Sequence, residues 1–345
     1  MFTNQCRCIN CITPPHILKK LIDNSDSRIR DAALRTLLST SRLRGERAVR
    51  GLLAPALATS THGRRTVFDC ANSNSVSSAT VARTEDGPAS ADDSVNNAFD
   101  GLGSTRDFYK EVFDRDSIDG RGMRLNGYVH FGSSFNNAFW DGSHMVFGDG
   151  DGVLFTDFTG SLDVIGHELT HGVTELTAGL TYHNQPGALN ESISDVFGSL
   201  VKQWARKQTA DQADWLIGAD IVKKGFPGKA LRSMAAPGTA YDGDDQPANM
   251  KDYVQTQSDN GGVHTNSGIP NKAFHDYAVA LGGNAWGRAG RVWYETLRDP
   301  GLGTDAQFVA FARITLSTAQ RLYGTEGDEV AALQDAWNGV GVTVA

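Results

Sequence analysis

The spacing of apolar residues predicts a chain that is β-rich first and α-helical second. Between residues 66 and 155, short alternating segments separated by glycine-rich turns are typical of a twisted antiparallel sheet. After residue 160 the apolar positions follow a helical spacing, and strands followed by helices indicate an α+β fold rather than alternating βαβ units. The predicted helices span residues 162–176, 189–207, 271–281, 288–298, 305–323 and 328–337.

The first fifty residues differ in charge from the rest of the chain. They hold ten Lys and Arg against four Asp and Glu, although the 345 residues together carry a formal net charge of −8. Residues 27–44 place apolar side chains among arginines, which predicts a basic amphipathic helix that needs a partner for its apolar stripe. The stripe consists of Ile29, Leu34, Leu37, Leu38 and Leu43.

Composition narrows the class of protein. A 40% share of hydrophobic residues excludes a disordered chain, and no apolar run approaches the ~18 residues of a membrane span. Residues 1–20 lack the apolar stretch of a secretory signal, so we expect a cytoplasmic protein, with signal-independent export as the alternative. We expect reduced thiols rather than a disulfide framework.

The motif H-E-x-x-H occurs once, at residues 167–171, inside a predicted helix. Its spacing puts His167 and His171 on one face, one turn apart, where both imidazoles can bind the same zinc ion. A catalytic zinc site needs a third protein ligand, and Glu191 on the next predicted helix supplies a carboxylate. Asp195, one turn beyond Glu191, is placed to accept the free ring N–H of a ligating histidine.

Other residues suit the remaining steps of peptide hydrolysis. Glu168 lies beside the metal without binding it, so it can act as general base on a water whose pKa the metal lowers to about 7. Attack of the water on the peptide carbonyl produces an oxyanion, which needs hydrogen-bond donors. His264, with Asp259 holding its other ring nitrogen, is one candidate and Tyr182 is a second.

Taken together, these residues resemble the thermolysin family of zinc metallopeptidases. The matching stretches are N-A-F-W at 137–140, M-V-F-G-D-G at 145–150, H-E-L-T-H at 167–171, T-A-G-L at 177–180 with Tyr182, N-E-S-I-S-D at 190–195, L-R-S-M at 231–234, N-G-G-V-H at 260–264 and N-S-G at 266–268. The resemblance implies a β-rich N-terminal domain and an α-helical C-terminal domain, with zinc in the cleft between them.

The resemblance also implies a set of site residues. His167, His171 and Glu191 would bind zinc, Glu168 would be the base, and Tyr182 and His264 would stabilise the transition state. Substrate contacts would come from Asn137 and the Ala138 backbone, which pair with an extended peptide, and from Arg232, which binds a carbonyl. A pocket suited to cleavage before large apolar residues would be lined by Phe155, Phe158, Val164 and Leu231.

Two features depart from the usual family pattern. Calcium ligands are expected near the second helix, and Asp163 and Asp214 match, but Lys202 and Ala219 replace the other acids. A lysine ammonium could neutralise the remaining carboxylates, so bound calcium is doubtful. The short leader, with Pro14 and Pro15, resembles the protealysin-like branch, in which short propeptides precede the enzyme.

From this leader we predict a precursor organised in three parts. Residues 1–50 would be an autoinhibitory propeptide, removed between about Gly45 and Ser60, followed by catalytic domains at 51–179 and 180–345. The basic helix would dock on its own acidic enzyme, so raised salt should weaken inhibition. Cys6, Cys8 and Cys11 are expected as plain thiols; the alternatives are a thiolate on the catalytic zinc and a small metal knot.

The predicted activity is a zinc-dependent neutral endopeptidase, a metalloendopeptidase that acts on proteins or peptides as a monomer, with no nucleic-acid or membrane partner. A zinc aminopeptidase is the runner-up, but 19 residues separate His171 from Glu191, whereas 18 are common in that class. A binding protein on a dead protease fold is the other alternative, which the full set of catalytic residues argues against. No G-x-S-x-G motif supports serine chemistry.

Overall fold

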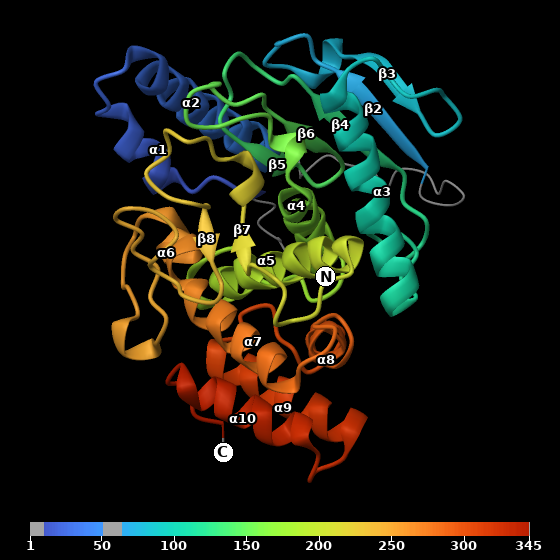
Figure 1. The fold of residues 1–345 in the computed structure, drawn as a ribbon, viewed down its shortest axis with the longest axis vertical. Coiled ribbons are helices and arrows are strands. Elements are labelled where there is room, and N and C mark those ends of the chain that lie inside the picture. Colours follow the sequence, from blue (N-terminus) through green and yellow to red (C-terminus); the bar gives the residue numbers. More distant parts are fainter. Residues whose placement is uncertain (1–9, 51–63, 345) are drawn as a thin grey trace. The chain divides into compact units, whose positions relative to one another are not determined.

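The computed structural model describes residues 10–50 and 64–344 (Figure 1). The chain divides into two units, of which the first comprises Met1–Gly172 with Gly218–Lys229 and the second Val173–Ile217 with Ala230–Ala345. Strands dominate the first unit and helices the second, so the α+β prediction is confirmed. The helix α4 (Leu162–Glu175) begins in the first unit and ends in the second.

The first unit is built on a six-stranded sheet with the order β1-β5-β6-β4-β2-β3. Three of its strand pairs are antiparallel, but β2–β4 and β4–β6 are parallel, so the prediction of an antiparallel sheet is wrong for these pairs. Parallel neighbours need a crossover, and the chain between β2 and β4 contains the helix α3. The strands are β1 (Asn10–Cys11), β2 (Arg65–Asp69), β3 (Thr80–Thr84), β4 (Leu125–Val129), β5 (Ala138–Trp140) and β6 (Met145–Phe147).

The helix α3 (Asp93–Phe113) was not predicted from the sequence. Its Ser, Asn, Asp and Gly residues have weak helix propensity, and for this reason the pattern did not indicate a helix. Its start is capped by Asp92, whose side chain accepts the Ser94 N–H at 2.8 Å. The helix packs along β2 and β4. Gly101 brings it so close to α4 that a Cβ atom there would lie 2.2 Å from the Ile165 Cδ1 atom. Tertiary packing therefore outweighs local propensity in this segment.

A histidine ties the start of α3 to the loop after β6. His130 contacts Asp149 through Nδ1 at 2.9 Å and Asp92 through Nε2 at 2.8 Å. The hydrogen bond to Asp149, followed by that to Asp92, raises the pKa of His130 from 6.5 to about 9 in spite of burial. The protonated imidazole is thus the cation between two carboxylates.

This arrangement predicts a loss of stability in alkaline solution. Because folding raises the pKa of His130, its stabilising effect is complete below pH 6.5 and disappears as the pH rises through about 9. We expect the unfolding free energy to fall more steeply between pH 7.5 and 10 in the wild type than in His130→Gln. Urea unfolding measures this, with the exposed His183→Gln as the control. Parallel pH curves for wild type and His130→Gln would contradict the prediction.

The leader consists of β1, α1 (Pro15–Ile22) and α2 (Ser27–Arg50), and it is part of the first unit. The predicted apolar stripe is only partly correct, because Leu34 and Leu38 are 44% and 63% exposed. The buried face of α2 instead carries Ile29 and small side chains, which allow a neighbouring segment of the same chain to approach closely. One of these, Thr36, accepts the Asn136 N–H at 2.9 Å. The other small residues of this face are Ala32, Ala33 and Thr40.

The second unit is a helical assembly around α5, whose residues from Pro186 to Gln203 are all buried. A strand pair, β7 with β8, lies in the same unit, and the indole rings of Trp293 and Trp337 stack at 5.9 Å between α8 and α10. No helix in the described part of the chain is long and apolar enough to cross a membrane. The elements are α5 (Asn184–Arg206), β7 (Leu216–Ile217), β8 (Arg232–Ser233), α6 (Asp259–Asn266), α7 (Gly268–Leu281), α8 (Arg288–Leu297), α9 (Phe308–Tyr323) and α10 (Asp328–Gly339).

Candidate active site

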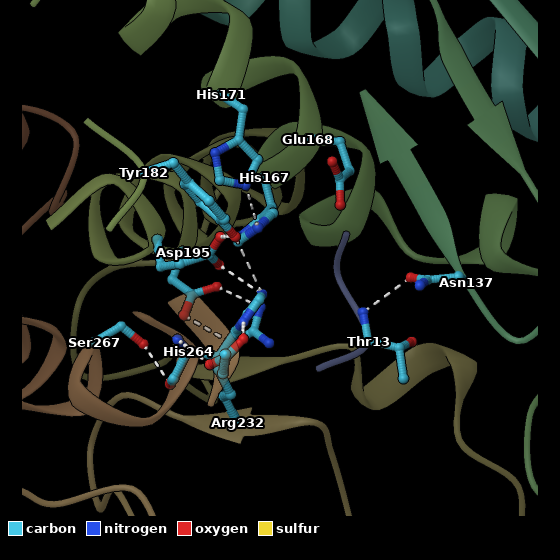
Figure 2. Close-up of polar contacts among 12 residues, drawn as sticks. Thr13, Asn137, His167, Glu168, His171, Tyr182, Asp195, Arg232, His264 and Ser267 are labelled. Carbon is cyan, nitrogen blue, oxygen red and sulfur yellow. Dashed lines mark hydrogen bonds and ion pairs between the residues drawn. The ribbon is translucent and has the colours of Figure 1, made fainter. Parts of the chain in front are cut away.

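The two histidines of the H-E-x-x-H motif face each other on α4 (Figure 2). Their Nε2 atoms lie 3.0 Å apart, and His167 and His171 are 0% and 1% exposed. Two buried imidazole nitrogens that converge in this way can share one ion, because zinc accepts both as ligands. Helical periodicity alone accounts for the convergence, since residues four apart lie on one face.

A carboxylate completes the metal-binding group. Among the described residues, His167, His171 and Glu191 form the one group of metal-capable side chains, with ligand atoms that all lie within 4.8 Å of one another. All three are buried. Two imidazoles and one carboxylate are the donor set of catalytic zinc sites that keep a fourth position open, so the residues present fit the ion.

Glu168 lies on the same helix as the histidines and is fully buried. Its Oε2 atom accepts the backbone N–H of Trp140 at 2.9 Å. This contact ties the carboxylate to β5, the strand next to which a substrate is expected to bind. Trp140 therefore supports Glu168 through a backbone group, which side-chain motifs cannot reveal.

Tyr182, Glu191 and His264 lie together in the second unit. Figure 2 shows Tyr182 and His264 of this group. The Tyr182 hydroxyl donates a hydrogen bond to the Glu191 Oε1 atom. His264 Nε2 lies 3.4 Å from both the Tyr182 hydroxyl and the Glu191 Oε2 atom. The expected transition-state groups thus meet at a proposed zinc ligand.

Asp259 orients the imidazole of His264. Its two oxygens contact the His264 Nδ1 atom at 2.8 Å and accept the His264 backbone N–H at 2.9 Å. Burial lowers the pKa of His264, but the carboxylates of Asp259 and Glu191 outweigh it, and the pKa is raised above 6.5. When His264 is protonated, Nδ1–H donates to Asp259 and Nε2–H can donate toward the site.

An unusual turn precedes His264. Asp259, Asn260, Gly261 and Gly262 have φ values of 53°, 51°, 85° and 75°, all in the left-handed region. Glycine is favoured at Gly261, because its φ of 85° strains other residues and a Cβ atom there would lie 3.1 Å from the Asn184 backbone nitrogen. The turn lets one Asp259 side chain reach both the backbone and the ring of His264.

Asp195 and Arg232 form a buried ion pair (Figure 2). Arg232 donates through Nε and Nη2, each at 2.8 Å from an Asp195 oxygen. Burial lowers the pKa of Arg232, but Asp195 raises it above its ordinary value. Asn271 also donates to Asp195, at 2.9 Å, and no sequence signal identified this partner. Asn271 and Arg232 thus both bind the Asp195 carboxylate, and the two hydrogen bonds from Arg232 fix the orientation of its guanidinium group.

Gln246 is a second residue that the sequence does not single out. Its side-chain amide donates to the His264 carbonyl oxygen at 2.6 Å and to the Ser267 hydroxyl at 3.1 Å. Ser267 also donates to the same carbonyl, at 2.8 Å. These bonds hold the backbone that carries the imidazole, and they form between residues 18 and 21 positions apart.

The expected substrate-binding edge at β5 is covered by the leader. β1 pairs antiparallel with β5, and the Ile12 N–H donates to the Ala138 carbonyl oxygen at 3.2 Å. The Thr13 N–H donates to the Asn137 side-chain oxygen at 3.0 Å (Figure 2). Leader residues therefore use the hydrogen-bonding groups that were expected to bind an extended peptide.

The residues expected to line the apolar pocket are all buried. In the first unit, the rings of Phe155 and Phe158 lie 5.9 Å apart, and Val164 is on α4. In the second unit, Leu231 directly precedes Arg232 and is 1% exposed.

The two described cysteines, Cys11 and Cys70, are buried as thiols in one apolar cluster with Phe139. Burial raises the pKa of Cys70 to about 12. Cys6 and Cys8 lie outside the described residues, as do positions 51–60 of the predicted cleavage region.

The helix-borne histidine pair with its carboxylate fits a zinc ion, and comparison with known proteins gives the family. Residues 56–175 match the thermolysin metallopeptidase catalytic domain, and residues 178–342 match the thermolysin metallopeptidase alpha-helical domain. The chain is 47% identical to an extracellular metalloprotease of Pectobacterium carotovorum subsp. carotovorum, over 98% of both chains. It is 44% identical to protease PrtS of Photorhabdus sp. (strain Az29), over 96% of this chain and 92% of that one.

A solved structure agrees with these matches. The precursor of protealysin, a metalloproteinase from Serratia proteamaculans, is 48% identical, with a TM-score of 0.88 over 97% of this chain and 100% of that one. The chain belongs to the thermolysin metallopeptidase family. It is a zinc-dependent neutral endopeptidase, so the predicted activity is confirmed and neither alternative is favoured.

The expectation of a cytoplasmic protein is wrong. A relative that matches almost the full chain is named an extracellular metalloprotease, which supports a secreted protein. The expectation rested on the lack of an apolar stretch in residues 1–20. That criterion detects one kind of export signal only, so it does not decide where a protein acts.

Proposed function

We propose that one zinc ion is held by His167, His171 and Glu191, and that Glu168 is the general base of peptide hydrolysis. The observation that carries this proposal is the buried histidine pair and carboxylate with Glu168 on the same helix. Zinc in such a site lowers the pKa of water and polarises the substrate carbonyl. Zinc quantification with cleavage-site mapping on a denatured protein, wild type against Glu168→Gln, tests the assignment.

The residues around the metal would then have separate roles in proton transfer and in stabilising the oxyanion. Glu168 takes a proton from the attacking water and delivers it to the leaving amine nitrogen, while the Trp140 N–H keeps the carboxylate in place. Tyr182 and His264 donate hydrogen bonds to the oxyanion of the tetrahedral intermediate. Asp259 holds the Nδ1 atom of His264, so a protonated imidazole would donate to the oxyanion from Nε2.

Substrate binding would use residues from several segments of the chain. Asn137 and the Ala138 backbone pair with an extended peptide, as they do with the leader. Arg232, held by Asp195, offers a guanidinium to a substrate carbonyl, and Asp195 would also accept a ring N–H of a zinc-binding histidine. Cleavage before large apolar residues would follow from a pocket that contains Phe155, Phe158, Val164 and Leu231.

The leader would keep the enzyme inactive. We infer that residues 1–50 are the propeptide and that 51–179 and 180–345 are the two catalytic domains. β1 takes the edge of β5, so a substrate and the leader compete for the same backbone groups. A basic helix whose small-residue face packs on its own enzyme needs no nucleic acid or membrane to bury that face. We also propose that the enzyme acts as a monomer.

Lys202 would take the place of a calcium ion beside α5. Its ammonium is 1% exposed, lies 3.0 Å from an Asp214 oxygen and donates to the Leu216 carbonyl oxygen at 2.8 Å. A fixed ammonium at this position supplies the positive charge that would otherwise come from a dication. Ala219 offers no carboxylate, and Asp163 accepts a hydrogen bond from Ser161.

This assignment predicts an enzyme that does not depend on calcium. After removal of metals with EDTA, zinc alone should restore full activity. Lys202→Met should lower the unfolding free energy by about 2 kcal/mol, since it removes a charged donor from Asp214 and Leu216. Urea unfolding measures the loss, with the exposed Lys251→Met as the control. A requirement for added calcium in the wild type would overturn the assignment.

A further inference from the structure

A cavity of about 600 Å³ lies in the second unit, between the start of α5 and the segment before α6. Its size is within the range of small-ligand sites. Five side-chain carboxamides line it, and four of them are exposed, so the cavity opens to solvent. These carboxamides belong to Asn184, Gln185, Gln255, Gln257 and Gln307.

The lining carries no ionisable acid or base other than the phenol of Tyr253. Each carboxamide offers both donors and an acceptor, which suits a peptide group or an uncharged polar side chain. A charged side chain would lose hydration there without meeting an opposite charge. The Gln185 Oε1 atom accepts the Phe308 N–H at 2.8 Å, which directs its NH₂ group to other partners.

Two residues of the cavity lining lie close in the sequence to groups that are expected to act on the substrate. Asn184 follows Tyr182 by two residues, and Gly261 lies between Asp259 and His264. Asn184 has a φ of 52°, and its side chain fits against Gly261 so closely that no Cβ atom could be added there. The side chain of Asn184 therefore packs against the turn that leads to His264.

We propose that this cavity is an additional subsite for the polypeptide substrate and that it selects an uncharged polar residue at a set distance from the cleaved bond. The inference rests on the proposed function, because the substrate reaches the cavity from the catalytic groups. Carboxamides beside an aromatic ring can also bind a sugar. The short distance in sequence from the lining to Tyr182 and His264 favours a peptide, since the proposed function brings a peptide substrate to those groups.

A substrate series tests the subsite on the purified enzyme. Peptides with one apolar cleavage site carry Gln, Lys or Asp at each of the flanking positions in turn, and kcat/KM is measured for each. The wild type should prefer Gln over both charged residues at one position by about tenfold. In the double variant Gln255→Glu/Gln307→Glu, Lys should be preferred over Asp at that same position by about tenfold, since two carboxylates replace exposed carboxamides.

The matched control is Gln212→Glu, an exposed substitution in the same unit that is not part of the cavity lining. It should retain the order of the wild type. An unchanged order of Gln, Lys and Asp in the double variant at every position would overturn the subsite. Inhibition by maltohexaose without any position-specific peptide preference would assign the cavity to a sugar and overturn it too.

Failure of the subsite and failure of the proposed mechanism are distinguishable. A blocked dipeptide is too short to extend beyond the catalytic groups, so its hydrolysis reports on those groups alone. If Glu168→Gln hydrolysed the dipeptide at the wild-type rate, the proposed mechanism would be wrong. Normal loss of dipeptide hydrolysis in Glu168→Gln, together with unchanged peptide selectivity in the double variant, would reject only the subsite.

Discussion

The Glu168→Gln enzyme is expected to bind one zinc ion like the wild type and to hydrolyse peptides about 10³-fold more slowly. General base catalysis contributes a factor of this order, and a carboxamide cannot accept the proton of the attacking water. The replacement is nearly isosteric, and the Gln oxygen can still accept the Trp140 N–H that now binds Glu168. Zinc content is measured by elemental analysis, and kcat/KM on a peptide with one apolar cleavage site.

The matched variant is His171→Ala, which removes a proposed ligand from the same helix. It should lose both zinc and activity, so the two variants separate metal binding from proton transfer. On a denatured protein, the cleavage sites of the wild type should lie before large apolar residues, and Glu168→Gln should produce almost none. A Glu168→Gln protein that held zinc and kept full activity would disprove the role of Glu168.

Replacing Ile12 with proline should activate the full-length chain. Proline removes the N–H that donates to the Ala138 carbonyl oxygen, and its ring disturbs the β1–β5 pairing. We expect hydrolysis of a short peptide by the intact precursor to rise about tenfold, because a weakened strand leaves the substrate edge more often. Activity is measured on the intact chain, with its length checked by mass spectrometry before and after the assay.

The control is Ile12→Ala, which removes most of the buried side chain but keeps the backbone donor. If the leader inhibits by strand pairing, Ile12→Pro should activate more strongly than Ile12→Ala. Raised salt should weaken inhibition by the separate leader peptide if charge contributes as well. Equal activity of the wild-type precursor and the enzyme without its leader would show that residues 1–50 do not inhibit.

Features that depend on neighbours in the sequence were predictable. The convergence of His167 and His171 follows from helix periodicity, and Asp195 lies one turn after Glu191 for the same reason. The left-handed turn before His264 is consistent with the run Asn260-Gly261-Gly262, because these residue types tolerate positive φ. The long apolar helices of the second half were predicted as well.

Features that depend on residues far apart in the sequence were not predictable from it. The apolar pattern of α2 predicted that Leu34 and Leu38 are buried, but both are exposed and small residues occupy the buried face. Small side chains let the helix pack closely against its neighbours, and close packing stabilises the fold. α3 forms in spite of poor propensity because it packs against β2, β4 and α4. Asn271 and Gln246 hold Asp195 and His264 through single hydrogen bonds across the fold.

The sequence by itself determined the class of reaction of this protein, and it was sufficient to propose the histidine pair that would bind the metal and the base beside it. Those residues act through spacing within one helix, and local spacing survives in any fold that keeps the helix. Tertiary structure decided that the leader lies on the edge of β5 and that five carboxamides line one cavity. These arrangements join segments far apart in the chain, and only the packing of the whole molecule brings such segments together.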